Sequence, residues 1–260
     1  MTGLEAVLLA GAAAGAGALN AVAGGGTFLT FPTLLFFGVE AIRANATSTF
    51  SLWPGGVASA YAYRRQLPAE RGELKGLVGV SLLGGGVGAV LLLLTPTVTF
   101  TRLIPFLLLT ATLLFTFNQH LQQLVRGRGA GAVAAAPKRG VLLAIQFAVS
   151  IYGGYFGAGV GIVMLAAFSL MQLEGIHQMN AMKTLLNAAM NFVALLLFVV
   201  AGAVDFGRGA VMLVAATLGG YLGAAIAQRL PAKGVRSFVV VTAWGMTAYF
   251  FIKTFVLHPG

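Results

Sequence analysis

The chain has 260 residues, of which 58% are hydrophobic and only 8% are charged. Because an ordinary soluble domain carries about 25% charged residues, this composition excludes a water-soluble globular protein. Cysteine is absent, which excludes disulfides, thiolate nucleophiles and thiolate metal sites, and we attribute the formal net charge of +10 to loops beside a membrane rather than to a nucleic-acid surface.

The chain is a series of apolar stretches, each long enough to cross a hydrocarbon core of about 30 Å as a helix of about 20 residues. Barrel strands alternate in polarity over about 10 residues, whereas these runs are continuously apolar. The sequence therefore predicts an all-α polytopic membrane protein. No Lys or Arg precedes the first run, so we expect it to remain in the mature protein. In chain order the stretches are Leu4 to Phe37, Asn45 to Tyr63, Leu74 to Leu94, Leu103 to Leu121, Val141 to Leu173, Met179 to Ala201, Gly209 to Ala227 and Phe238 to Leu257.

The two halves of the chain resemble each other at an offset of 135 to 137 residues. Residues 83–89, for example, match residues 218–224 in order, and we predict that these glycine-rich segments are packing seams between helices. The alternative is coincidence in a chain that has 36 glycines. We predict two repeats, residues 1–121 and 141–260, joined by a flexible cytoplasmic linker at residues 122–140.

Basic residues indicate how the repeats are oriented, because loops rich in Lys and Arg stay on the cytoplasmic side. They cluster in residues 64–75, 126–139 and 229–236, and these clusters share one face only if a stretch between them does not cross the membrane. The long stretches Leu4 to Phe37 and Val141 to Leu173 are interrupted by glycines, so each is predicted to be a broken helical hairpin. Each repeat then has one hairpin and three transmembrane helices, which inverts the second repeat and places both termini outside.

The two glycine-rich breaks are predicted to form the substrate site. Unwound backbone within the hydrocarbon region occurs only where it is buried in protein or lines a wet cavity. A half-helix begins at each break, and its free N–H groups and partial positive charge suit an anion. The alternative is that the glycines only permit a tight hairpin. The predicted cradle consists of Asn20, Gly24, Gly25, Gly26 and Thr27 in the first half and of Tyr155, Gly157, Gly159 and Gly161 in the second.

Polar residues on the helix after each hairpin are predicted to complete the pocket. In the second half they recur at spacings of three and four, and so form one stripe on an apolar helix. Lys183 is the most informative, because an ionisable residue within a membrane segment is costly; the alternative is that it snorkels to the interface. All acids lie at the ends of stretches, which disfavours a cation carrier. The residues are Asn45, Thr47 and Ser48 in the first half and Asn180, Lys183, Thr184 and Asn187 in the second.

The residues around the first break resemble a family signature. Asn20 to Pro32, followed by Ala44 to Ser48, closely resembles the signature of the TauE/SafE sulfite exporter family, and Gly157 to Gly161 followed by Lys183-Thr184 is similar to its repeated form. The likeness covers essentially the whole chain. It implies a multi-pass exporter or permease of the bacterial inner membrane, with sulfite or a small organosulfonate such as sulfoacetate as its substrate.

The predicted function is secondary transport of a small oxyanion by alternating access, without a cofactor. An anion channel with the same site open to both sides is an alternative, which steep voltage dependence and a lack of saturation would reveal. An intramembrane enzyme is not favoured, because no nucleophile has a base at a workable spacing. The three histidines share no ligand spacing, so no metal site is predicted. The expected partners are the anion and the lipid bilayer, without nucleic acid, and small-residue helix faces make a homodimer reasonable.

Overall fold

The apolar stretches form helices throughout the part of the chain that the structure describes. This computed structural model describes residues 1–22, 25–67, 71–129, 139–170, 176–227 and 232–257. The elements are α1 (Gly3–Val22), α2 (Thr27–Phe36), α3 (Ala41–Ala62), the short 3₁₀ helix η1 (Arg64–Gln66), α4 (Arg71–Leu94), α5 (Thr97–Gly129), α6 (Arg139–Tyr155), α7 (Val160–Leu170), α8 (Ile176–Val200), α9 (Phe206–Ala227), α10 (Ala232–Ile252) and the π-helical turn η2 (Lys253–Leu257).

Both long stretches contain a broken helix, as the sequence predicts. The first comprises α1 and α2, and the second comprises α6 and α7. Gly25 in the first break has a φ of 99°, and Gly157 and Gly159 in the second have φ values of 75° and 71°. Glycine adopts these left-handed conformations without the penalty that a Cβ imposes, so the helices end where these glycines stand.

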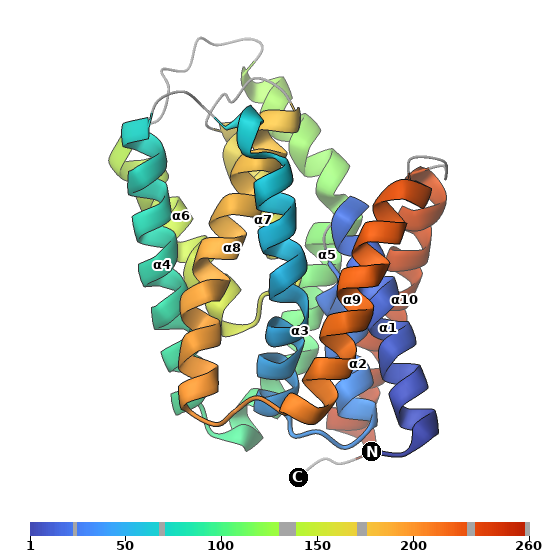
Figure 1. The fold of residues 1–260 in the computed structure, drawn as a ribbon. Coiled ribbons are helices and arrows are strands. Elements are labelled where there is room, and N and C mark those ends of the chain that lie inside the picture. The colour runs from blue at the N-terminus through green and yellow to red at the C-terminus, as the bar shows by residue number, and fades with distance from the viewer. Residues whose placement is uncertain (23–24, 68–70, 130–138, 171–175, 228–231, 258–260) are drawn as a thin grey trace.

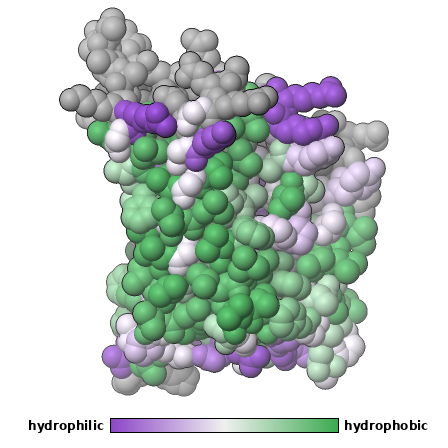
Figure 2. All heavy atoms as spheres, turned by 60° about the vertical axis from the view of Figure 1, so that its left-hand side comes forward, coloured by the Kyte–Doolittle hydropathy of each residue, from purple (hydrophilic) through white to green (hydrophobic). Residues whose placement is uncertain are grey.

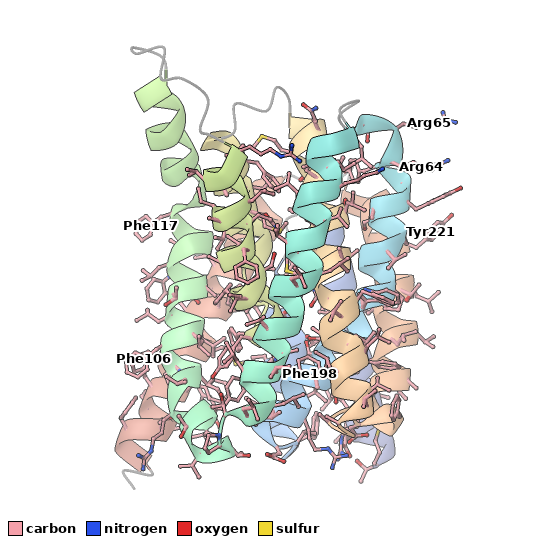
Figure 3. The ribbon with its side chains drawn as sticks, turned by 90° about the vertical axis from the view of Figure 1, so that its left-hand side faces the viewer. Arg64, Arg65, Phe106, Phe117, Phe198 and Tyr221 are labelled. Atoms are coloured by element: carbon pink, nitrogen blue, oxygen red, sulfur yellow. The ribbon has the colours of Figure 1, made fainter. Side chains whose placement is uncertain are left out.

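The two hairpins start from opposite ends of the helical bundle (Figure 1). The start of α1 lies at one end, together with the end of α10, whereas α6 starts at the other end. Arg64 and Arg65 lie at this other end (Figure 3). Arg139 joins them, and its Nη2 donates a hydrogen bond of 3.2 Å to the Gly72 carbonyl. Basic residues from the first two sequence clusters therefore share one end of the bundle, away from the start of α1.

Helix α5 is longer than the sequence predicts. We expected a flexible linker over residues 122–140, but α5 continues to Gly129, so the first part of that segment is helical. Residues 130–138 lie outside the described part of the chain. Leu121 to Val125 still contains helix-forming residues such as Leu and Gln, so the end of the apolar run is not the end of the helix.

The outer surface of the bundle is suited to lipid. Apolar side chains form a broad belt around the face seen in Figure 2, and hydrophilic residues gather at its two ends. Phe106, Phe117 and Tyr221 project outward from the bundle (Figure 3). Segments within α1, α4 and α8 are long and apolar enough to cross a membrane. A surface of this kind is stable only where hydrocarbon replaces water, and the chain is therefore a multi-pass membrane protein.

Each hairpin packs against a helix of the other half: α1 lies along α9, and α6 lies along α4. Glycines allow these close approaches. A Cβ on Gly219 would clash with the Ala14 carbonyl, and a Cβ on Gly84 would lie 2.8 Å from the Phe147 carbonyl. The two glycines are equivalent at the offset of 135 residues. The prediction that the glycine-rich segments are packing seams is confirmed at these contacts.

A charged cluster ties the start of α1 to the start of α9. The Arg208 guanidinium donates from Nε to Glu5 and from Nη1 to Asp205, both at 2.7 Å. Asp205 lies between α8 and α9, outside the membrane-spanning helices. Burial raises the pKa of its carboxyl, but hydrogen bonds from Arg208 and the positive charges of Arg208 and Arg43 lower it by more. The pKa of Asp205 therefore lies below its ordinary value, and the ion pair stabilises the fold at neutral pH.

We expect Arg208→Gln to lower the thermal midpoint of unfolding by about 2 to 4 °C at neutral pH, because it removes a partly exposed ion-pair cluster worth about 1 kcal/mol. A carboxyl with a lowered native pKa contributes stability above its unfolded pKa, and this contribution disappears as pH falls through the native pKa. The two proteins should therefore converge at acidic pH. Thermal unfolding in detergent across pH measures this, with the exposed Arg65→Gln as the control; a constant difference at every pH would contradict the prediction.

Candidate functional site

The first break is held together by one of its predicted site residues. Asn20 Oδ1 accepts a hydrogen bond of 2.7 Å from the backbone N–H of Gly26. A Cβ on Gly26 would lie 2.6 Å from the Ala16 carbonyl, so only glycine fits between α1 and α2 here. Asn20 therefore already occupies one of the N–H groups that we predicted for the anion. Gly25 and the half-buried Thr27 flank this turn, and Gly24 lies outside the described residues.

The second break has its carbonyl oxygens covered by side-chain donors. Tyr152 donates its hydroxyl to the Ala158 carbonyl at 2.6 Å. Asn45 of α3 donates from Nδ2 to the Tyr155 carbonyl at 3.2 Å. Carbonyl oxygens repel an anion, so these two bonds reduce the negative potential of the break. At the start of α7, the N–H of Val160 donates to the Gly157 carbonyl at 3.3 Å and that of Val163 to the Gly159 carbonyl at 3.4 Å. An α-helix leaves its first N–H groups without intrahelical partners, so those of Gly161 and Ile162 are the ones left for an anion.

Aromatic rings enclose the second break. The ring of Phe156, within the break, meets Phe31 of α2 edge to face, with 5.4 Å between centroids. Phe100 of α5 packs against both Tyr155 and Phe156 at 5.7 Å and 6.4 Å. Phe31, Phe100 and Phe156 are fully buried or nearly so. Such a wall excludes water, which strengthens any electrostatic interaction with the backbone groups of the break.

The first-half polar residues of α3 are buried and mostly serve the fold. Thr47 Oγ1 accepts a hydrogen bond of 2.9 Å from the Asp205 N–H, and so anchors the turn before α9. Ser48 and Thr30 of α2 share a hydrogen bond of 2.6 Å between their hydroxyls. Asn45 is the one that reaches the second break. The structure thus brings α3 of the first half to the break of the second half, while Thr47 and Ser48 have structural partners.

The polar stripe on α8 is half-buried. The Lys183 side chain lies against the start of α7, where a Cβ on Gly161 would be 3.3 Å from Lys183 Cδ. Among the described residues, no carboxylate forms an ion pair with Lys183. Thr184 donates to the Asn180 carbonyl at 3.0 Å. Asn191 Nδ2 donates to the Asn187 carbonyl at 2.9 Å and to Asn187 Oδ1 at 3.0 Å. The stripe is therefore continuous, and Lys183 is its member next to the second break.

The chain matches one family model over most of its length. The model is described as sulfite exporter TauE/SafE, and residues 8–250 match it. The chain belongs to the TauE/SafE family. It is therefore a membrane transporter of this family, as the resemblance around the first break implies. All the predicted site residues, the second hairpin and most of the first lie within the matched region.

Relatives of this TauE/SafE protein carry names of the same kind. "Probable membrane transporter protein YfcA" of Escherichia coli K12 is 27% identical over 233 residues, which is 90% of this chain and 84% of the relative. A "Probable membrane transporter protein" of Haemophilus influenzae is 26% identical over 230 residues, 88% of each chain. "Probable membrane transporter protein ORF9" of a Sinorhizobium species is 24% identical over 228 residues, 88% of this chain and 85% of the relative. No solved structure matches the chain.

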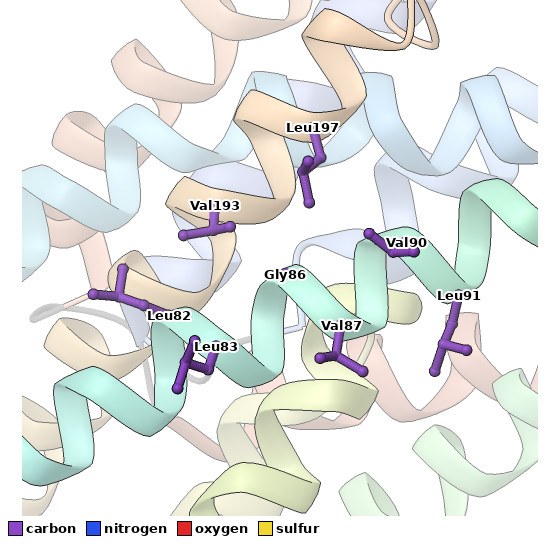
Figure 4. A pocket seen from close by; sticks show the side chains of 8 residues that line it. All are labelled: Leu82, Leu83, Gly86, Val87, Val90, Leu91, Val193 and Leu197. Atoms are coloured by element: carbon purple, nitrogen blue, oxygen red, sulfur yellow. The ribbon is translucent and has the colours of Figure 1, made fainter.

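A groove on the surface of this TauE/SafE protein lies away from the predicted site. It has a volume of about 480 Å³ and runs between α4 and α8 (Figure 4). Its lining is apolar and offers no charge or hydrogen-bond donor to an anion. It also includes none of the predicted site residues, so we assign it to the lipid-facing surface. Its lining residues are Leu82, Leu83, Gly86, Val87, Val90, Leu91, Val193 and Leu197.

Buried polar residues also occur outside the predicted site, and two of them illustrate what such residues do. Thr30, the fully buried partner of Ser48, lies within the motif that we read from the sequence but was not chosen. Gln146 of α6 is also fully buried and donates from Nε2 to the hydroxyls of Ser81 and Ser150, at 2.9 and 3.1 Å. A glutamine within an apolar stretch is itself a signal, because burying an amide without partners is costly.

Proposed function

We propose that this transporter moves a small oxyanion, sulfite or an organosulfonate such as sulfoacetate, by alternating access. The observation that supports it best is the second break, where Asn45 and Tyr152 cover the carbonyls of Tyr155 and Ala158. The N–H groups of Gly161 and Ile162, in the first turn of α7, then remain to face an anion, since those of Val160 and Val163 donate to the Gly157 and Gly159 carbonyls. Lys183 beside Gly161 supplies the positive charge for an anion at this point.

We further propose that the two halves are inverted repeats that rock against each other around the two breaks. The opposite starting ends of α1 and α6 support this arrangement (Figure 1). The basic residues Arg64, Arg65 and Arg139 share the end that we assign to the cytoplasm, since positively charged loops stay inside. Both termini then lie outside, and the membrane is the bacterial inner membrane.

A flux experiment on purified protein in proteoliposomes tests the substrate class. We expect saturable uptake of sulfite and sulfoacetate, with little uptake of simple carboxylates, because the family that the chain belongs to is described as one of sulfite exporters. Sulfate and taurine are included to define the charge and size that the site accepts. Uptake of carboxylates and of sulfur oxyanions at equal rates, or uptake of neither, would contradict the proposal. A flux that rises linearly with substrate concentration would contradict alternating access.

A further inference from the structure

Asn45 has an oxygen that is buried and lacks a partner. Its side chain lies one turn into α3 and is 1% exposed. Within the described part of the chain, Asn45 Oδ1 and Gln146 Oε1 are the buried side-chain atoms for which no hydrogen-bond partner is found. Buried polar atoms in native proteins are nearly always hydrogen-bonded, and those that are not commonly await a ligand, an ion or a water molecule.

The orientation of the Asn45 amide is determined by its other hydrogen bond. Nδ2 donates 3.2 Å to the Tyr155 carbonyl, and a carbonyl oxygen only accepts. The nitrogen must therefore face Tyr155, and the oxygen must face elsewhere. Turning the amide over would place two oxygens against each other and leave a buried NH₂ unpaired. The atom without a partner, Asn45 Oδ1, is consequently a hydrogen-bond acceptor, to which an O–H or N–H group can donate.

The location of this acceptor connects it with the proposed substrate. Tyr155 is the last residue of α6, and Asn45 therefore reaches the second break, beside the start of α7. The buried rings of Phe31 and Phe156 meet at the same break. Helix N–H groups that suit an oxyanion and a neutral acceptor that suits a donor thus lie at the same break.

We propose that Asn45 Oδ1 accepts a hydrogen bond from the transported anion itself. This inference rests on the proposed function and adds a preference among its substrates for anions that keep an O–H or N–H donor beside the charged group, such as hydrogen sulfite or a hydroxy- or amino-substituted sulfonate. An asparagine is suited to this task, because it presents an acceptor without a negative charge. A carboxylate at position 45 would accept equally well but would repel the anion.

The test compares two sulfonates of nearly equal size and identical charge. In 2-hydroxyethanesulfonate a hydroxyl stands where 1-propanesulfonate has a methyl group. In proteoliposomes, we expect the wild-type protein to transport the hydroxyl compound about fivefold better at low concentration, which is the effect of one net hydrogen bond. Equal rates for the two compounds would overturn the inference while leaving anion transport intact. Transport of neither sulfonate, nor of sulfite, would instead refute the proposed function.

Two variants test whether Asn45 causes the preference for 2-hydroxyethanesulfonate over 1-propanesulfonate. Asn45→Leu should reduce the ratio between the two sulfonates to about one, because it removes the acceptor at nearly constant volume. Gln146→Leu is the matched control, since it removes an equally buried unpaired amide oxygen from the α4–α6 seam and should leave the ratio at its wild-type value. A preference that survives in Asn45→Leu, or disappears only in Gln146→Leu, overturns the assignment. If Asn45→Leu does not fold, the wild-type ratio decides.

A second measurement covers a carrier that admits sulfite but excludes larger sulfonates. Sulfite flux is recorded at pH values below and above the second pKa of sulfurous acid, with the total sulfite concentration held constant. We expect flux to follow the monoprotonated form in the wild type and in Gln146→Leu, and to lose that dependence in Asn45→Leu. Flux that follows the dianion in the wild type would overturn the inference.

Discussion

Lys183→Met is expected to reduce anion flux at low substrate concentration by at least about 30-fold, because it removes the positive charge that would pair with the anion. Lys183 lies against Gly161 at the start of α7, and no carboxylate in the described part of the chain neutralises it. An anion at the second break would supply that missing charge. Methionine keeps the length and the apolar stem of the side chain, so packing against α7 should change little.

Initial rates of sulfite uptake into proteoliposomes measure this effect, at equal amounts of inserted protein. Lys75→Met is the matched control, because Lys75 is exposed near the start of α4 and is not part of the predicted site. It should transport at the wild-type rate. If Lys183→Met transports normally, Lys183 only extends toward the interface and the anion is held elsewhere.

The broken hairpins were predictable because glycine has a direct conformational consequence. Gly25, Gly157 and Gly159 interrupt long apolar runs, and all three adopt positive φ in the structure. The seams were predictable for a similar reason, since small residues in the same order in both halves indicate close helix contacts. These features depend on local conformation and can be read from the sequence itself, as the break after Tyr155 follows from Gly157 and Gly159.

The partners of the polar residues were not predictable, because they depend on contacts between distant segments. Asn45 meets Tyr155 across 110 positions, and Thr47 meets Asp205 across 158. From the sequence alone, each of these residues looked equally available to a substrate. Because α3 packs against α9, Thr47 bonds to the backbone of Asp205 and is not available to a substrate. Asn45 contacts the end of α6 through its nitrogen, and its side-chain oxygen has no partner.

The end of α5 also escaped prediction, for a different reason. Hydropathy marks where a chain leaves the membrane, and we ended the stretch at Leu121 on that basis. Backbone hydrogen bonding does not stop at the edge of the hydrocarbon, so the helix continues to Gly129. Helix boundaries outside the membrane therefore need information that a polarity pattern lacks.

Gly85→Ala is expected to destabilise the protein strongly, because it places a methyl group where α4 meets the backbones of two other helices. A Cβ on Gly85 would clash with the Met190 carbonyl of α8, and the Gly85 carbonyl itself lies where a Cβ on Gly154 of α6 would be. Helix α4 is thus clamped between two backbones that a side chain would force apart. Overpacking against backbone, which cannot change rotamer, should cost about 3 kcal/mol or more and lower the thermal midpoint by about 10 °C.

Gly79→Ala tests whether this effect belongs to the seam rather than to loss of a glycine. Gly79 lies on the same helix, and a Cβ there would meet no atom within 4 Å. Alanine is favoured over glycine in a helix interior by about 1 kcal/mol, so this variant should melt at or above the wild-type temperature. Thermal unfolding of both variants in one detergent gives the comparison. Similar midpoints for Gly85→Ala and Gly79→Ala would mean that α4 is not in close contact with the backbones of α6 and α8.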